Sequence, residues 1–312
     1  MIQNNSGALS AAQIWRLPFL AVVKDYVSLA KPGVISLLLI STCCPMILAS
    51  AGEVRLSAIL WALVGGALVS GSAGVINCIW DRDIDAIMER TKARPIPAGR
   101  VGAFAALIYA LIIGTIGLAV LYYFFSPLTA LTALAGHLFY VFIYTMWLKR
   151  STPQNIVIGG AAGAIPPLVG WVAVTGGFDF TAILLFLIVF LWTPPHFWAL
   201  ALNKNEDYRR AKIPMLPVVS GEQATHLQML LYALSLIPVS IWLVFSDPLL
   251  GWFSFITLTL LGLIFSWKVY QLKNLVGADT ETKTKKAWDV FGFSLIYLAL
   301  FFFCLVVDAT VL

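Results

Sequence analysis

Residues 57–85 read SAILWALVGGALVSGSAGVINCIWDRDID, an apolar run that passes directly into a cluster of aspartates. The apolar part, 57–79, is long enough to cross a hydrocarbon layer of roughly 30 Å as a helix. Asn77, Asp81 and Asp85 recur every four residues, so continuation of that helix would align their oxygens on one face. The stretch therefore predicts a membrane helix that ends in a polar site able to hold hard cations.

The rest of the chain has the composition of a membrane protein. Its 312 residues are 60% hydrophobic and only 11% charged, whereas soluble domains carry about a quarter charged residues. Backbone groups in lipid must be hydrogen-bonded internally, so the long apolar runs are expected to be helices. The nine predicted runs are 34–51, 57–79, 103–124, 128–147, 156–175, 181–202, 228–246, 249–270 and 290–311. We therefore predict an all-α integral membrane protein with one nine-helix transmembrane domain over 33–312.

The distribution of basic residues predicts how the helices are oriented. The connections after the second, fourth, sixth and eighth runs, together with the N-terminal segment, hold 19 of the 20 Lys and Arg residues, and only Arg55 lies opposite. Loops on the cytoplasmic side are enriched in Lys and Arg. The N-terminus and these loops are thus expected on the cytoplasmic or matrix side, with the C-terminus outside.

The N-terminal segment 1–32 is predicted to lie at the membrane interface. Residues 13–31 mix aromatic and aliphatic side chains with Arg16, Lys24 and Lys31, which is typical of an interfacial helix. For residues 1–12, a disordered leader is an equal alternative. The segment has neither the pattern of a secretory signal nor that of an Arg/Ser-rich presequence, which favours a bacterial plasma membrane.

A second polar cluster follows the sixth run. Residues 203–221 read NKNEDYRRAKIPMLPVVSG, and Asn203 and Asp207 repeat the spacing of Asn77 and Asp81 at an offset of 126 residues (203 − 77 and 207 − 81). Four intervening runs preserve the orientation. The pattern predicts a parallel internal repeat in which the second helix corresponds to the sixth, with both clusters on one side of the membrane.

Two facing acidic clusters with interleaved cations suit the binding of a diphosphate. Mg²⁺ is usually shared between one or two carboxylates and substrate phosphates, and Arg or Lys contacts would stabilise a departing diphosphate. An isoprenoid tail would lie within the apolar bundle. Aromatic residues available to stabilise an allylic carbocation, or only to pack, are Tyr140, Tyr144, Trp192, Phe197 and Trp198.

Several motifs together resemble the UbiA family of intramembrane prenyltransferases over about residues 30–221. After the aspartate motif come MERTKARPIPAGR (88–100), LKRSTPQNIVIGG (148–160), AGAIPPLVGW (162–171), WTPPHFWALAL (192–202) and EDYRRAKIPMLPV (206–218). The resemblance implies a UbiA-type helix bundle that transfers the farnesyl group of farnesyl diphosphate to a vinyl group of haem B, with addition of water, giving haem O and diphosphate. It further implies Mg²⁺ as cofactor, the lipid bilayer as surroundings, haem A synthase or terminal oxidase assembly proteins as candidate partners, and no nucleic acid.

The resemblance also implies how the site residues divide their roles. Asn77, Asp81 and Asp85 correspond to the first aspartate-rich motif and Asp207 to the second, and these four would hold Mg²⁺. Many family members have a carboxylate where Asn203 stands, so the second motif here contributes one charged ligand. The implied diphosphate contacts are Asn77, Arg90, Lys92, Arg94, Lys149, Arg150, Asn203 and Lys204. For Lys149 and Lys204, a role in topology or lipid contact is an equal alternative. The residues implied to act in catalysis are Asp81, Asp85 and Asp207, and His196 is a further catalytic candidate because it lies in a spanning helix.

Two single polar residues, His196 and Asp83, have competing interpretations. His196 precedes Asn203 by seven residues, so a regular helix places the two on one face about two turns apart. A histidine in a spanning helix is a functional candidate, here as an iron ligand, a porphyrin-positioning group or a proton carrier. A hydrogen bond to a neighbouring helix is the alternative. Asp83 lies off the Asn77 face, and a salt bridge to a loop cation competes with a substrate role.

Three other functions share part of this pattern. A related prenyltransferase with an aromatic or quinone-precursor acceptor would need the same Mg²⁺ site, and only the acceptor-side motifs argue against it. A transporter could also contain a repeat, but transporter sites lie near the membrane midplane, whereas Asp81, Asp85 and Asp207 lie at the ends of runs. Retention of both clusters argues against a non-catalytic factor that delivers haem.

Overall fold

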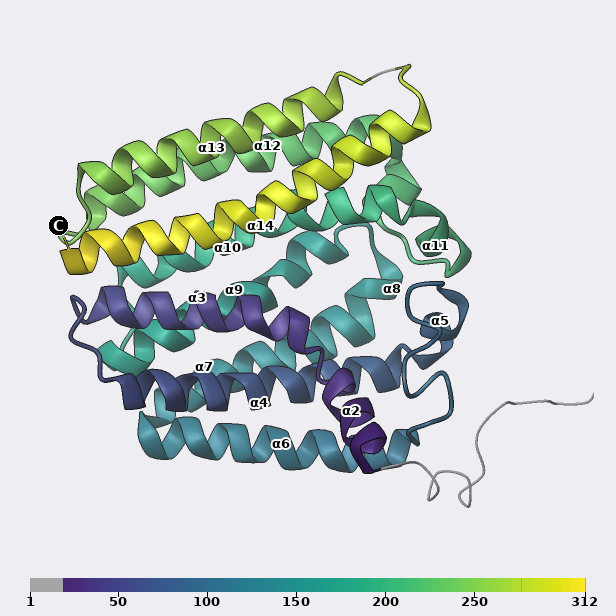
Figure 1. The fold of residues 1–312 in the computed structure, drawn as a ribbon, viewed down its shortest axis with the longest axis horizontal. Coiled ribbons are helices and arrows are strands. Elements are labelled where there is room, and N and C mark those ends of the chain that lie inside the picture. Colours follow the sequence, from purple (N-terminus) through teal and green to yellow (C-terminus); the bar gives the residue numbers. More distant parts are fainter. Residues whose placement is uncertain (1–18, 276, 312) are drawn as a thin grey trace, which may run out of the picture.

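A computed structural model describes residues 19–275 and 277–311, which form a bundle of long helices (Figure 1). Nine helices in the described part are long and apolar enough to cross a membrane. They are α3 (Pro32–Ala49), α4 (Leu56–Trp80), α6 (Ala103–Phe124), a composite helix (Pro127–Ser151), α9 (Asn155–Thr175), α10 (Phe180–Asn203), α12 (Leu216–Ser246), α13 (Trp252–Lys273) and α14 (Thr280–Val311). The predicted all-α integral membrane fold is confirmed.

The remaining helical segments are short or complete the fourth span. The composite fourth span consists of α7 (Pro127–Leu138), the π-helical segment η1 (Phe139–Leu148) and α8 (Lys149–Ser151). Three short helices stand outside the spans: α2 (Phe19–Leu29), α5 (Arg82–Ile87) and α11 (Asn205–Arg210). Helix α2 falls within the predicted interfacial helix over 13–31, while residues 1–18, including Arg16 and the predicted leader, lie outside the described residues.

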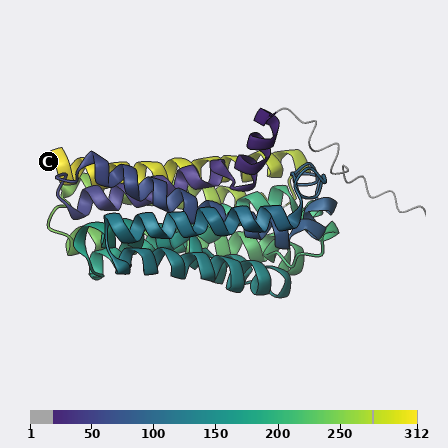
Figure 2. The same ribbon diagram turned by 90° about the horizontal axis from the view of Figure 1, so that it is seen from below.

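The long helices run along one axis, so their connections gather at the two ends of the bundle (Figures 1 and 2). Helices α2, α5, α8 and α11 lie at one end, which we call the polar end, and the C-terminal end of α14 lies at the other (Figure 1). The sequence predicted this grouping of the basic connections on one side. The polar end consequently collects the chemistry-bearing loops of three different spans.

Small residues allow neighbouring helices to approach closely. Helix α4 packs along α6, where Gly65 and Gly117 face one another. A Cβ atom at Gly117 would lie 2.9 Å from the Gly65 backbone oxygen and 2.8 Å from Leu68 Cβ. Helices in lipid associate through this kind of close packing, because burial of apolar surface gives little advantage there. The pair α4–α6 therefore forms a fixed support for the polar residues at the end of α4.

Two spans extend farther than hydropathy predicted. The seventh run was predicted at 228–246, but α12 begins at Leu216 and contains one non-helical residue, Gly221, at φ 77°. The ninth was predicted at 290–311, but α14 begins at Thr280. Hydropathy marks only the apolar part of a helix. In α14 the polar turns from Thr280 continue the helix, whereas in α12 the non-helical Gly221 separates the apolar first turn from the predicted run. Both extensions lie at the polar end (Figure 1).

The second and sixth spans share a local architecture. Helix α4 ends at Trp80 and the six-residue helix α5 begins two residues later. Helix α10 ends at Asn203 and the six-residue helix α11 likewise begins two residues later. Each break precedes an acidic cluster followed by basic residues and prolines. The arrangement agrees with the predicted parallel repeat.

Candidate active site

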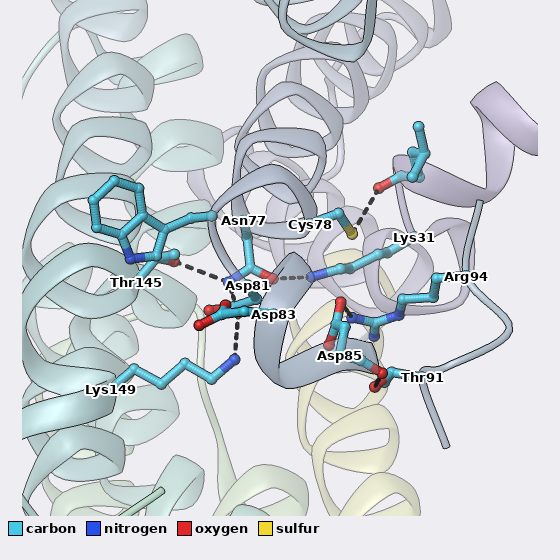
Figure 3. Close-up of polar contacts among 12 residues, drawn as sticks. Lys31, Asn77, Cys78, Asp81, Asp83, Asp85, Thr91, Arg94, Thr145 and Lys149 are labelled. Atoms are coloured by element: carbon cyan, nitrogen blue, oxygen red, sulfur yellow. Dashed lines mark hydrogen bonds and ion pairs between the residues drawn. The ribbon is translucent and has the colours of Figure 1, made fainter. Parts of the chain in front are cut away.

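The first acidic cluster lies where α4 passes into α5. The backbone N–H of Asp81 donates to Asn77 O at 2.9 Å, and that of Asp85 donates to Asp81 O at 2.8 Å. The hydrogen bonding of a helix thus continues across the junction, as the four-residue spacing required. On the shared face, Asn77 Nδ2 donates to Asp81 Oδ2 at 2.8 Å and to Thr145 Oγ1 of η1 at 3.1 Å (Figure 3).

Two cations reach this cluster from the end of the fourth span. Lys149 Nζ forms an ion pair with Asp81 Oδ2 (Figure 3), and Arg150 Nη2 lies 3.6 Å from Asp81 Oδ1. Arg150 also binds both carboxylate oxygens of Asp83, at 2.7 and 2.8 Å. These bonds lower the pKa of the Asp83 carboxyl to about 2. Lys149 and Arg150 therefore belong to the polar cluster, and Asp83 forms the salt bridge that was one of its two interpretations.

Asp85 is turned toward the loop that follows α5. Arg94 Nη1 donates to Asp85 Oδ2 at 2.7 Å, with the carboxylate buried and Arg94 mostly buried (Figure 3). Thr91 Oγ1 donates to the backbone oxygen of Asp85 at 3.0 Å, which holds the loop against the helix. Arg94 is thus positioned beside the acidic stripe, and its contact to a diphosphate stays a prediction.

Sequence reasoning missed Lys31 as a member of this site. Lys31 precedes Pro32 at the start of α3, in a left-handed conformation at φ 60°, and its Nζ donates to Asn77 Oδ1 at 2.5 Å (Figure 3). Burial lowers the pKa of this ammonium below its usual range. The available signal was its place at the polar end of the first span. In the sequence, Lys31 was counted only among the basic residues that predict the orientation of the helices.

The second cluster, on α11, lies against the loop after α5. Asp207 is buried and forms an ion pair with Arg210. Burial opposes its ionisation, but hydrogen bonds from Arg210 and from the Glu89 backbone lower the pKa of its carboxyl. The neighbouring Tyr208 has its pKa raised by burial, an effect opposed by the charge of Arg90. The two clusters therefore meet through the loop that carries Glu89 and Arg90.

Other predicted contacts point elsewhere. Lys92 is paired with Glu89 at 2.5 Å and is more than half exposed. Lys204 Nζ lies 5.9 Å above the ring of Trp288, and Asn203 Nδ2 donates to Ala199 O at 3.1 Å. The structure therefore does not bring Lys92, Lys204 or the Asn203 amide nitrogen to the first cluster. Their roles at a diphosphate stay predictions.

His196 is buried between α10 and α14. Its Nδ1 lies 2.7 Å from Ser294 Oγ, and its ring stacks on Trp192 at 4.3 Å and on Phe291 at 4.7 Å between centroids. Trp192 Nε1 donates to Ser294 O at 2.8 Å. This geometry is the interhelical hydrogen bond that was the alternative interpretation. A catalytic role for His196 stays a prediction.

The oxygen atoms of the two clusters are of the kind that Mg²⁺ prefers as ligands. Among the described residues, no three His, Cys, Asp or Glu side chains come close enough to form a metal site by themselves. Buried oxygens without a hydrogen-bond partner there include Asp81 Oδ1, Asn203 Oδ1 and Asn205 Oδ1. Oxygens of this kind suit Mg²⁺, which commonly takes one or two protein carboxylates and completes its coordination with phosphates and water.

Residues 37–295 match the model of the UbiA prenyltransferase family. The chain belongs to this family. It is 49% identical over 294 residues to the protoheme IX farnesyltransferase of Roseiflexus castenholzii, and 48% identical over 291 residues to that of Picosynechococcus; each alignment covers 93% of the chain. The chain spans about half the length of the Roseiflexus relative, 53%, and 90% of the Picosynechococcus relative.

Solved structures show the same fold. The chain resembles a structure of digeranylgeranylglyceryl phosphate synthase with a TM-score of 0.74 and 20% identity, covering 94% of this chain and all of the other. A UbiA homologue from Archaeoglobus fulgidus, bound to DMAPP and Mg²⁺, aligns with a TM-score of 0.65 and 13% identity over 89% of this chain and 99% of the other. At these identities the likeness establishes the UbiA-type bundle.

Proposed function

We propose that this protein transfers the farnesyl group of farnesyl diphosphate to a vinyl group of haem B, with addition of water, to give haem O and diphosphate. The observation that carries the proposal is the near-50% identity to protoheme IX farnesyltransferases across 93% of the chain. The buried polar cluster around Asp81 supports it, because its charges suit a bound diphosphate. The location of the acidic residues at helix ends favours this chemistry over transport.

In this proposal the cations of the polar end hold the leaving group. Arg94, Lys149 and Arg150 would each exchange part of their contact with an aspartate for a diphosphate oxygen. Lys31 would do the same from the Asn77 side. Asn77, Asp81, Asp85 and Asp207 would hold Mg²⁺, which supplies charge neutralisation for the departing diphosphate when bound.

The proposed reaction has two parts, departure of the diphosphate and attack of the haem vinyl group on the farnesyl carbon. The bond between the farnesyl C1 and the diphosphate oxygen breaks, and its electron pair leaves with the diphosphate. The vinyl carbons of haem B then supply the electrons for a new C–C bond, and water adds to the cation that forms beside the porphyrin ring, releasing one proton. Tyr140 and Tyr144 of η1, with ring centroids 5.4 Å apart, are candidates to shield and stabilise the allylic cation near the polar cluster.

The proposed setting is a bacterial plasma membrane with the polar end on the cytoplasmic side. Of the Lys and Arg residues within 19–275 and 277–311, only Arg55 falls in a connection at the opposite end. A water-soluble diphosphate would then enter and leave at the polar end, while the farnesyl chain and the porphyrin approach within the bilayer. Haem A synthase and terminal oxidase assembly proteins are the candidate partners in this setting.

The test is a reconstituted reaction. Purified protein in lipid nanodiscs would be incubated with haem B, farnesyl diphosphate and Mg²⁺, and the extracted haem would be analysed by mass spectrometry. We expect a hydroxyethylfarnesyl haem that requires all three additions. Parallel reactions with 4-hydroxybenzoate in place of haem B test the aromatic-acceptor alternative. Prenylation of that acceptor, with unchanged haem B in the first reaction, would refute the haem assignment while retaining prenyl transfer.

A further inference from the structure

A cavity lies at the polar end, away from the candidate active site. It has a volume of about 570 Å³ and is lined by residues from the end of α13 and the start of α14. Figure 1 shows these two helix ends at the upper right. Its walls include Trp267 and Tyr270 from α13, and Lys285, Lys286 and Asp289 from α14. None of these residues belongs to the aspartate clusters. The proposed function leaves this cavity without a role.

The charges around this cavity leave a positive surplus. Asp289 accepts from Lys268 through both oxygens at 2.9 Å and lies 3.3 Å from Lys286 Nζ. One carboxylate thus faces two ammonium groups. Lys285 adds a third, and no acidic side chain in residues 19–275 and 277–311 lies within 4 Å of it. Lys268 lies outside the cavity wall, so the wall itself carries two cations, Lys285 and Lys286, and one anion, Asp289. This surplus of positive charge favours occupation by an anionic group.

The wall on the α13 side is aromatic and open. Trp267 and Tyr270 are 58% and 42% exposed, and their rings stack with centroids 5.6 Å apart and planes inclined by 27°. The two residues lie three positions apart, on one face of α13. Tryptophan and tyrosine concentrate at the level of lipid headgroups, where one part of the ring contacts apolar chains and another contacts water. This wall therefore suits a ligand with an apolar part.

We propose that the cavity binds the phosphate group of an anionic phospholipid. Lys285 and Lys286 bind the phosphate oxygens, while the glycerol and upper acyl chains lie against Trp267 and Tyr270. Basic pockets between membrane helices recognise acidic headgroups in this way. A free inorganic phosphate shares the charge but makes no use of the aromatic wall, which is the reason for assigning the site to a lipid. The bound lipid joins the ends of α13 and α14.

Native mass spectrometry of the full chain tests the assignment. Protein in neutral detergent would be titrated with phosphatidylglycerol or with zwitterionic phosphatidylcholine of the same acyl chains. The variant Lys285→Gln/Lys286→Gln keeps the length of both side chains nearly unchanged and removes both charges. Lys273→Gln is the matched control, because Lys273 stands in the last turn of α13 outside the cavity wall. A further series adds millimolar phosphate to the wild-type complex.

The wild-type protein is expected to bind phosphatidylglycerol more tightly than the double variant by about 30-fold, since each lysine near an anionic headgroup contributes about fivefold. Lys273→Gln should retain wild-type binding, and Trp267→Ala should bind the lipid more weakly. Equal retention of phosphatidylcholine, or equal loss in Lys273→Gln and in the double variant, would overturn the proposal. Complete displacement by millimolar phosphate would overturn the lipid as ligand and assign the cavity to free phosphate.

Discussion

Replacement of Asp81 by asparagine should lower activity by removing a charge at the candidate active site while keeping the shape of the side chain. Asp81 is fully buried, and its Oδ2 faces Lys149 Nζ and Asn77 Nδ2. Asparagine retains the volume and can still accept from Asn77, but it removes the negative charge that would hold Mg²⁺. Loss of one preorganised electrostatic group at an active site lowers kcat by about 100- to 1000-fold, which is the range expected for Asp81→Asn.

Asp83→Asn is the matched control two residues along the chain. Its side chain is 60% exposed, and its partner Arg150 is 35% exposed. An exposed ion pair contributes about 0–1 kcal/mol, which corresponds to a loss of activity below about fivefold. Initial rates of farnesyl transfer to haem B, measured by chromatography of extracted haem, would be compared for the two variants in the same nanodiscs.

The stability of Asp81→Asn must be measured beside its activity. Removing one partner of a buried ion pair costs about 3–5 kcal/mol, and the lower end applies here because Lys149 is 16% exposed at the polar end and can reorient toward water. The double variant Asp81→Asn/Lys149→Met removes both charges, so it should recover thermal stability without recovering activity. The reasoning would be refuted by an Asp81→Asn protein with more than a tenth of wild-type kcat, or by an Asp83→Asn protein that is equally impaired.

Three further outcomes are expected. Arg94→Lys keeps the charge but loses the planar donor that binds Asp85 at 2.7 Å, so kcat/KM for farnesyl diphosphate should fall about tenfold; unchanged kcat/KM would remove Arg94 from the site. Chelation by EDTA should abolish transfer and added Mg²⁺ should restore it, as measured by haem product, whereas full activity in EDTA would exclude a metal requirement. Gly117→Ala should lower the free energy of unfolding by about 1–3 kcal/mol, seen as a lower thermal midpoint, because its Cβ meets the Gly65 backbone. The control is Gly66→Ala, whose Cβ meets only Leu39 Cδ2 at 3.9 Å. An equal drop in the thermal midpoint of both variants would contradict the packing argument.

The fold was predictable because its main features depend on local sequence patterns. Apolar length identified all nine spans in the described residues, and basic connections identified the end at which they meet. The spacing of Asn77, Asp81 and Asp85 placed their oxygens on one face only if the helix continued, and the i to i−4 backbone hydrogen bonds of Asp81 and Asp85 meet that condition. The start of α14 was less accessible, since its polar first turn carries no hydropathy signal, and in α12 the polar residues 220–226 separate the apolar first turn from the apolar run.

Contacts between distant segments were the part that sequence could not supply. Lys31 and Asn77 are 46 residues apart, and nothing in their local sequence states that the start of α3 lies beside the end of α4. The sequence around Lys149 likewise does not indicate its ion pair with Asp81, 68 residues away. For His196, helical spacing predicts which face of the helix carries the side chain. It does not predict the partner of Nδ1, Ser294, which is 98 residues away in the sequence.

The π-helical segment η1 makes the number of residues in the fourth span as important as their identity. A π-helix places more residues in each turn than an α-helix, and such segments frequently occur at functional sites. Residues after η1 consequently point in a direction that an uninterrupted α-helix of equal length would not reach. Deleting one residue within 139–148 would rotate Lys149 away from Asp81 without changing any charged group. This span should therefore tolerate substitutions far better than insertions or deletions, a pattern that deep mutational scanning can measure directly.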